Sequence, residues 1–257
     1  MPARRILTVL VLALTTSGVL MSTPVIAASI TASRCLVAAH RGDHLTATED
    51  GMLAMRQAVR DGVEILEADV HATSDNRLVL MHDATLKRTT NGTGMVRSQT
   101  GAAVHALLLH DGSHVPYLYQ LLDLARSSNR TVLLELKGMG GPLSYLRLRA
   151  GLLAAGSHVI IQSASPKILD RVPQISPGTQ RAIISRTQVP VATVQKYGGI
   201  VIAQTALTDT YLNQLNGLPI YVYTVNDPAG WARFANRVTA VITNQPVGYI
   251  GYRGSVC

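Results

Sequence analysis

Nine short apolar runs, most of them separated by helix-compatible segments, are the feature that most limits the folds open to this sequence. Each run is short enough to be a buried strand. Helix-compatible segments lie between many of them, at residues 49–60, 118–126, 143–155, 166–172 and 209–215. Repeated units of this kind predict a (β/α)8 TIM-type barrel. The apolar runs are residues 36–39, 65–70, 78–81, 132–136, 159–161, 182–184, 200–203, 220–223 and 240–243.

The second and third runs break the regular pattern. Residues 73–77 alone separate them, which is too few for a parallel crossover but enough for a hairpin. We therefore expect a short hairpin irregularity after the second strand, with one strand antiparallel or outside the regular count. With a turn near Asp75, Glu67 and Asp69 would lie level with residues 80–82 on the returning strand. Two residues apart on a strand, these carboxylates point to the same side.

Ionisable residues stand at the ends of four apolar runs. The carboxyl ends of parallel strands lie at the same end of an α/β barrel, so we expect these side chains to lie close together at the mouth of the barrel. Histidines, carboxylates, an arginine and a lysine in one place could form a metal-assisted phosphate site. The four groups are His40-Arg41-Gly42, Glu67-Ala68-Asp69, His82-Asp83 and Glu135-Leu136-Lys137.

The first 28 residues have the order of a secretory signal peptide. Two arginines precede a mostly apolar stretch at 6–21, and small residues follow at 24–28. The alternative is a retained membrane anchor, but the stretch is short for a span and is interrupted at 15–18. We expect residues 1–28 to be removed and residues 29–257 to form a single domain. The mature protein would be secreted or extracytoplasmic, with no stable membrane anchor.

Charge and cysteine usage narrow the partners. The formal net charge of +8 falls to +6 without Arg4 and Arg5, which favours anionic substrates. The sequence has no dense basic run with interleaved aromatic residues, which is the pattern expected of a nucleic-acid-binding protein. We therefore expect a small-molecule substrate, and we expect the protein to be a monomer.

Cys35 and Cys257 are the two cysteines. Export would favour a disulfide between them, and a closed barrel would bring the chain ends together; two unpaired thiols are the alternative.

At this point the residues resemble a known family, the glycerophosphodiester phosphodiesterases of the phospholipase-C-like barrels. The agreement runs in order through most of the chain beyond the signal peptide. It is carried by Ala39-His40-Arg41-Gly42, Glu49, residues 62–70, Met81-His82-Asp83-Ala84-Thr85-Leu86, residues 88–94, Leu134-Glu135-Leu136-Lys137, Gln162-Ser163, Tyr223-Thr224-Val225-Asn226 and Ile242-Thr243-Asn244-Gln245-Pro246.

The resemblance implies a barrel enzyme that uses a divalent cation to hydrolyse glycerophosphodiesters to an alcohol and glycerol 3-phosphate. By position, His40 and His82 match the acid/base pair. Arg41, Lys137 and Glu49 match substrate-binding positions. The metal carboxylates are matched by Glu67, Asp69 and Glu135. Independently of the resemblance, three carboxylates are hard oxygen ligands suited to Ca²⁺ or Mg²⁺ rather than zinc.

The chain also departs from the family pattern. Thr48-Glu49-Asp50-Gly51 replaces Pro-Glu-Asn-Thr, residues 116–120 lack the usual acid, and Asn244 replaces an aspartate. Ala164 and Tyr223 stand where the family often has an aromatic residue and a tryptophan. The substrate wall is therefore expected to differ. The alternatives are a lysophospholipase D or a glycerol-phosphate polymer hydrolase with the same site, a non-catalytic binder of phosphate ligands, and a purely structural envelope protein.

Overall fold

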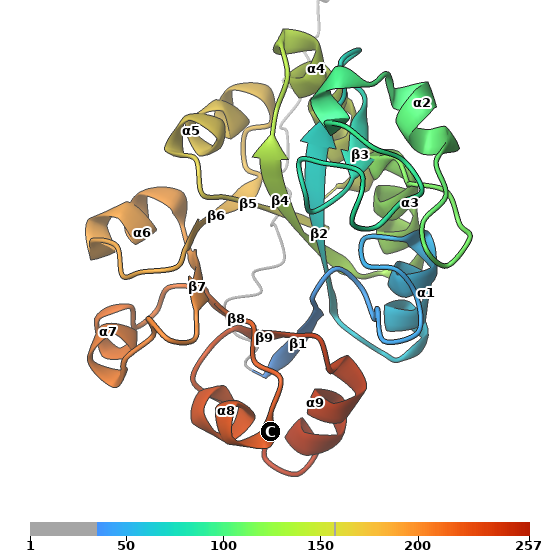
Figure 1. Cartoon of the computed structure of the whole chain (residues 1–257). Helices are drawn as coiled ribbons and strands as arrows, with labels where there is room; N and C mark the ends of the chain where they lie inside the picture. Colours follow the sequence, from blue (N-terminus) through green and yellow to red (C-terminus); the bar gives the residue numbers. More distant parts are fainter. Residues whose placement is uncertain (1–34, 157) are drawn as a thin grey trace, which may run out of the picture.

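The computed structural model describes residues 35–156 and 158–257, and these form a closed barrel of eight parallel strands surrounded by helices (Figure 1). The order around the barrel is β1, β2, β4, β5, β6, β7, β8 and β9, and β9 pairs with β1 to close it. The predicted (β/α)8 barrel is confirmed. The barrel strands are β1 (Leu36–Ala39), β2 (Ile65–Ala72), β4 (Thr131–Gly138), β5 (Val159–Ser163), β6 (Gln180–Ser185), β7 (Ile200–Ala203), β8 (Ile220–Tyr223) and β9 (Ala240–Thr243).

The helices cover the outside of this ring. Five of them correspond to the expected helical segments, although α1 begins at Met52 rather than at residue 49 and α5 continues to Ile175. Four helices were not anticipated, because each is short and lies in a segment without a long helical repeat. The helices are α1 (Met52–Arg60), α2 (Gly101–Ala106), α3 (Leu118–Ser128), α4 (Pro142–Ala155), α5 (Pro166–Ile175), α6 (Val191–Tyr197), α7 (Asp209–Gln214), α8 (Pro228–Phe234) and α9 (Pro246–Arg253).

The apolar runs arise because the barrel strands are buried on both faces. Inside the barrel, alternate strand residues such as Ala38, Leu133 and Tyr221 form one buried cluster. Their neighbours along each strand, such as Val37 and Leu134, pack outward against the helices in a second, larger cluster. Side chains therefore fill the barrel, and the open space lies at its mouth.

The expected hairpin is present after β2. Strand β3 (Leu78–Leu80) pairs antiparallel with β2, and Val70 lies opposite Leu80. The turn is held at Thr73, whose hydroxyl donates to Asp75 Oδ1 at 2.6 Å. The backbone N–H of Met81 then donates to the carbonyl of Asp69, so the residues that follow β3 lie beside Asp69. The chain that follows, including a 3₁₀ turn at Val96–Ser98, packs around its own small apolar cluster.

The end of the described chain is fastened to its beginning. A disulfide joins Cys35 to Cys257, as expected from the sequence, with the two Cα atoms 6.4 Å apart. Beside it, Arg253 of α9 forms an ion pair with Glu64 at 2.6 Å and donates to the carbonyl of Cys35. The predicted signal peptide lies outside the described residues. Within the described ranges, no helix is both long and apolar enough to cross a bilayer.

Candidate active site

A cavity of about 450 Å³ opens at the mouth of the barrel, where the carboxyl ends of the strands meet. Seven of the eight residues proposed from the sequence for the active site line it: His40, Arg41, Glu67, Asp69, His82, Glu135 and Lys137. A second cavity of about 470 Å³ lies between residues 212–220 and 237–239. Its charged lining residue, Arg237, is already paired with Asp209 at 2.7 Å, so ionisable chemistry is concentrated at the mouth.

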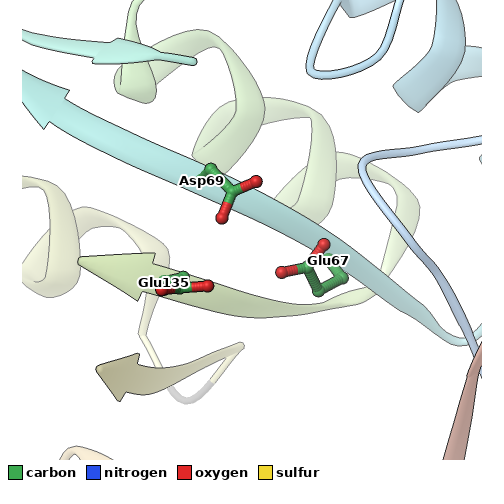
Figure 2. A group of neighbouring side chains, drawn as sticks. All are labelled: Glu67, Asp69 and Glu135. Carbon is green, nitrogen blue, oxygen red and sulfur yellow. The ribbon is translucent and has the colours of Figure 1, made fainter. Parts of the chain in front are cut away.

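Three carboxylates converge on one side of the cavity. Glu67 and Asp69 project from β2, and Asp69 is in register with Glu135 on the adjacent strand β4 (Figure 2). Each residue offers one carboxylate oxygen, and these three atoms lie within 4.8 Å of one another. Both oxygens of Asp69 are buried and receive no hydrogen bond from the described residues. A hard divalent cation fits this all-oxygen donor set.

Burial and crowding make this carboxylate cluster unusual. Burial, followed by the charges of Asp50 and Glu135, raises the pKa of Glu67 to about 8. Burial and the charge of Glu67 raise the pKa of Asp69 well above its ordinary value, although Lys137 opposes the change. Burial also raises the pKa of Asp50, whose Oδ1 accepts the backbone N–H of Asp69 at 3.1 Å. Positive charge among these groups is therefore strongly favourable.

Two basic side chains supply part of that positive charge. Arg41 Nε lies 3.2 Å from Asp69 Oδ2, and the backbone N–H of Arg41 donates to Glu67 Oε2 at 3.0 Å. Lys137 Nζ lies 3.2 Å from Asp69 Oδ1 and 2.9 Å from Glu135 Oε2. Because Arg41 and Lys137 also line the cavity, they can contact an anion placed above the carboxylates.

The turn that presents Arg41 requires a glycine. Arg41 and Gly42 both have positive φ, at 59° and 82°. A Cβ atom on Gly42 would lie 2.7 Å from the carbonyl carbon of Ala54 at the start of α1. Glycine therefore allows the β1–α1 turn to pack directly against that helix while Arg41 faces the mouth.

His40 is held by a neutral partner. With the amide oxygen of Asn244 2.7 Å from its Nδ1, the ring donates its Nδ1 hydrogen to that oxygen and leaves Nε2 as the proton acceptor. Burial, followed by the charge of Arg41, lowers the pKa of His40 to about 3, although the Asn244 hydrogen bond opposes the change. The imidazole is therefore neutral near pH 7.

His82 has a charged partner instead. Its Nδ1 lies 2.7 Å from Asp83 Oδ1, and Asp83 in turn accepts from Arg88 Nε at 2.6 Å. Burial lowers the pKa of His82, whereas Asp83 opposes that change. A carboxylate beside the ring stabilises the imidazolium form, so His82 is better placed than His40 to hold a proton.

Glu49, the eighth residue proposed from the sequence, does not line the cavity. Its carboxylate pairs with Arg41 Nη1 at 2.9 Å and with Arg88 Nη2 at 2.6 Å. Burial opposes ionisation, but the hydrogen bonds from Arg88 and Arg41 hold its pKa at about 2. Glu49 therefore links Arg41, which lies beside the carboxylate cluster, to Arg88, which pairs with Asp83.

The structure adds residues that the sequence analysis left without a role. Gln162, near the end of β5, donates to Glu67 Oε1 at 2.8 Å, and Asn244, directly after β9, holds His40. Both lie at the carboxyl end of a barrel strand, so the rule that selected the other site residues would also have selected them. Asp50 and Arg88 follow no strand, and their contacts depend on loops that meet only in the folded chain.

Comparison with known proteins agrees with this geometry. The model of the glycerophosphoryl diester phosphodiesterase family matches residues 40–141. The glycerophosphodiester phosphodiesterase of Bacillus subtilis is 31% identical over 96% of this chain and 97% of its own length. The chain belongs to this family. A shorter match of 36% identity joins 39% of the chain to 33% of human glycerophosphodiester phosphodiesterase 1.

Solved structures support the same family fold. A glycerophosphodiester phosphodiesterase from Agrobacterium tumefaciens superposes with a TM-score of 0.74 at 24% identity, covering 84% of this chain and 99% of that one. A phosphodiesterase from Oleispira antarctica, solved with the product sn-glycerol-3-phosphate, has a TM-score of 0.76 at 20% identity, over 86% and 97%. As a family member, this chain is a phosphoric diester hydrolase that acts on glycerophosphodiesters.

Proposed function

We propose that this protein hydrolyses glycerophosphodiesters to an alcohol and glycerol 3-phosphate by two-histidine acid/base catalysis with a divalent cation, Ca²⁺ or Mg²⁺. The observation that carries the proposal is the convergence of three carboxylates, two histidines and two cationic side chains on one cavity. The sn-glycerol-3-phosphate bound to the Oleispira phosphodiesterase supports the same product here.

Glu67, Asp69 and Glu135 would hold the cation through oxygen ligands. The three carboxylate oxygens within 4.8 Å of one another and the raised pKa values of Glu67 and Asp69 support this assignment. When bound, the cation would offset negative charge on the phosphoryl oxygens. Gln162 would orient Glu67 through its 2.8 Å hydrogen bond.

Arg41 and Lys137 would bind the phosphate. Both line the cavity, and each lies 3.2 Å from an oxygen of Asp69, so a phosphate bound above that carboxylate would be within reach of both cations. Glu49 would act on substrate binding through Arg41, because its contacts to Arg41 and Arg88 fix the guanidinium instead of leaving the carboxylate free.

The two histidines would divide proton transfer according to their partners. Neutral His40, with Nε2 left as an acceptor, would act as the base in the first step. His82, paired with Asp83, would donate a proton to the leaving alcohol. The roles would reverse in the second step.

The nucleophile of the first step would be the 2-hydroxyl of the substrate glycerol, which is tethered beside phosphorus and favoured by proximity. Its oxygen would bond to phosphorus as the bond to the alcohol oxygen breaks, giving a cyclic phosphate. Water would then open the ring to glycerol 3-phosphate. Diesters with this hydroxyl free should react, whereas the 2-deoxy analogue should not.

We further propose that the protein works outside the cytoplasm, after loss of residues 1–28. The order of charged, apolar and small residues at 4–28 supports export, and the Cys35–Cys257 disulfide suits an oxidising compartment.

The test is a turnover screen with Ca²⁺ and with Mg²⁺, using diesters with a free 2-hydroxyl and a 2-deoxy analogue. Variants His40→Gln and His82→Gln should each lower kcat by about 10²- to 10⁴-fold. His110→Gln is the matched control, because His110 is exposed and does not line the cavity. Rapid hydrolysis of the 2-deoxy analogue would refute the cyclic route, and full activity of both site variants would refute two-histidine catalysis.

A further inference from the structure

The cavity has two walls of different chemistry. His40, Arg41, Asp69 and Lys137, on or beside β1, β2 and β4, belong to the wall that carries the proposed reaction. The facing wall comes mainly from β6 and β8, and its residues have no role in that reaction. It includes Ile184, Ser185 and Arg186 at the end of β6 and Tyr223 and Thr224 at the end of β8.

Arg186 is the charged residue of this second wall. It follows β6 by one residue and has the same parity as Ala182 and Ile184, which belong to the cluster inside the barrel. Alternation along the strand therefore directs Arg186 toward the mouth. In the order of barrel strands, β6 is diametrically opposite β1, which carries His40 and Arg41 (Figure 1).

The positive charge of Arg186 is not neutralised by the protein. Within residues 35–156 and 158–257, no carboxylate lies within 4.0 Å of its guanidinium, in contrast to Arg41, Arg88 and Arg253. Its guanidinium interacts with the hydroxyl of Tyr223, which donates to the carbonyl of Ser185 at 3.1 Å. Arg186 and Tyr223 both line the cavity, and Arg186 remains exposed there.

The acidic residues lining the cavity are all on the other wall. They are Glu67, Asp69 and Glu135, the cluster already assigned to a cation. A cationic alcohol such as choline would therefore lie near the positive charge of Arg186, and the second wall offers no carboxylate to pair with it. An alcohol carrying a carboxylate or a phosphate would find a charge-assisted donor there.

We propose that Arg186, which lines the cavity together with Tyr223, forms a second anion-binding subsite that selects glycerophosphodiesters whose alcohol carries an additional anionic group. The proposal rests on the proposed function, which places the glycerol 2-hydroxyl and the phosphate at the cation and the histidines. In-line displacement then directs the leaving alcohol away from the attacking hydroxyl. The leaving oxygen would lie at His82, and the rest of the alcohol would extend across the cavity to the lining residues of β6 and β8, where Arg186 would receive the anion.

Steady-state kinetics on four substrates test the subsite. Glycerophosphocholine, glycerophosphoglycerol, glycerophosphoglycerate and 1,3-bis(glycerophospho)glycerol carry a cationic, a neutral, a carboxylate-bearing and a phosphate-bearing alcohol. The wild-type kcat/KM should rise from the cationic to the anionic alcohols. Comparison of the last two substrates identifies which anion the subsite prefers.

The variants Arg186→Gln and Arg186→Glu test the residue itself. The anionic-to-cationic ratio of kcat/KM should fall by about 3- to 10-fold in Arg186→Gln, as expected for loss of a partly exposed charged hydrogen bond. It should fall further, or invert, in Arg186→Glu. Arg149→Gln is the matched control, because Arg149 is exposed on α4 and does not line the cavity.

The outcomes separate the two proposals. If the wild-type enzyme hydrolyses all four substrates at equal kcat/KM, or if Arg186→Gln keeps the wild-type ratio, the anion subsite is refuted and the proposed function stands. If none of the four is hydrolysed with Ca²⁺ or Mg²⁺, the proposed function fails and the subsite fails with it. A ratio that changes equally in Arg149→Gln also refutes the subsite, because the effect would then come from net charge.

Discussion

Asn244 is the hydrogen-bond partner of the His40 ring, and replacing it with aspartate should raise the pKa of that histidine. The Asn244 oxygen lies 2.7 Å from His40 Nδ1, so Asn244→Asp keeps an acceptor in place and adds a negative charge. Aspartate is also the residue that the family pattern has at this position. The substitution therefore tests electrostatics with little change in shape.

The size of the effect follows from the contact. Two unit charges about 4 Å apart interact by about 4 kcal/mol at an effective dielectric constant of about 20, which corresponds to about 3 pKa units. Part of the loop is accessible to solvent, so we expect a rise of about 1 to 3 units. The pKa of His40, which burial and Arg41 lower to about 3, should then lie between about 4 and 6.

NMR titration of the histidine ring signals measures this pKa directly. Nε2 of His44 lies 3.4 Å from the same Asn244 oxygen, so the titration should be repeated with His44→Gln to assign the signals. If neutral His40 is the base, activity is lost as pH falls through its pKa. The acid limb of kcat/KM should therefore move to higher pH in Asn244→Asp.

Asn244→Ala is the matched control, since it removes the acceptor without adding charge. Its His40 pKa should stay low, because burial remains the largest cause of the shift. An unchanged His40 pKa in Asn244→Asp would show that the side chains do not meet as described. A raised pKa with an unmoved acid limb would show that His40 is not the base.

Three further predictions concern the clasp, the cation and the arginine pair. Replacing Cys35 and Cys257 together by serine should lower the free energy of unfolding by at most about 5 kcal/mol in the chain-entropy model for a separation of 222 residues; urea unfolding with no loss would contradict it. Asp69→Ala should weaken Ca²⁺ or Mg²⁺ binding in calorimetry, and full turnover after exhaustive chelation would exclude the metal site. Glu49→Gln should lower kcat/KM by about tenfold, because one charged hydrogen bond to Arg41 is weakened; an unchanged value would remove Glu49 from substrate binding.

The barrel could be predicted from sequence because its strands are buried on both faces. Runs such as residues 200–203 are apolar throughout, and their short length and recurrence between helix-compatible segments indicate buried strands. The hairpin was equally accessible, since five residues cannot make a parallel crossover. Short helices such as α6 and α8 were not, because seven residues give too little periodicity and their stability comes from packing on the barrel.

The cavity lining was predictable where a residue lies at or just beyond the carboxyl end of a strand. This rule selected His40 and Glu135, because a parallel barrel brings all such positions to one mouth. The links between side chains were not accessible in the same way. Glu49 bridges Arg41 and Arg88, and Arg88 lies 39 positions after Glu49 in the sequence. The loops that carry these residues come together only in the tertiary fold.

The covalent clasp of the barrel changes what a protease can do to this enzyme. A single cut in any loop between Cys35 and Cys257 would give two fragments that stay joined through the disulfide. The parallel pairing of β1 with β9 would hold those fragments in register. Such a nicked molecule would migrate as one species on a non-reducing gel and as two after reduction. Cleavage at the exposed loop after Arg186 would thus separate the peptide backbone of β1 to β6 from that of β7 to β9 while leaving the two parts of the barrel in one covalent molecule.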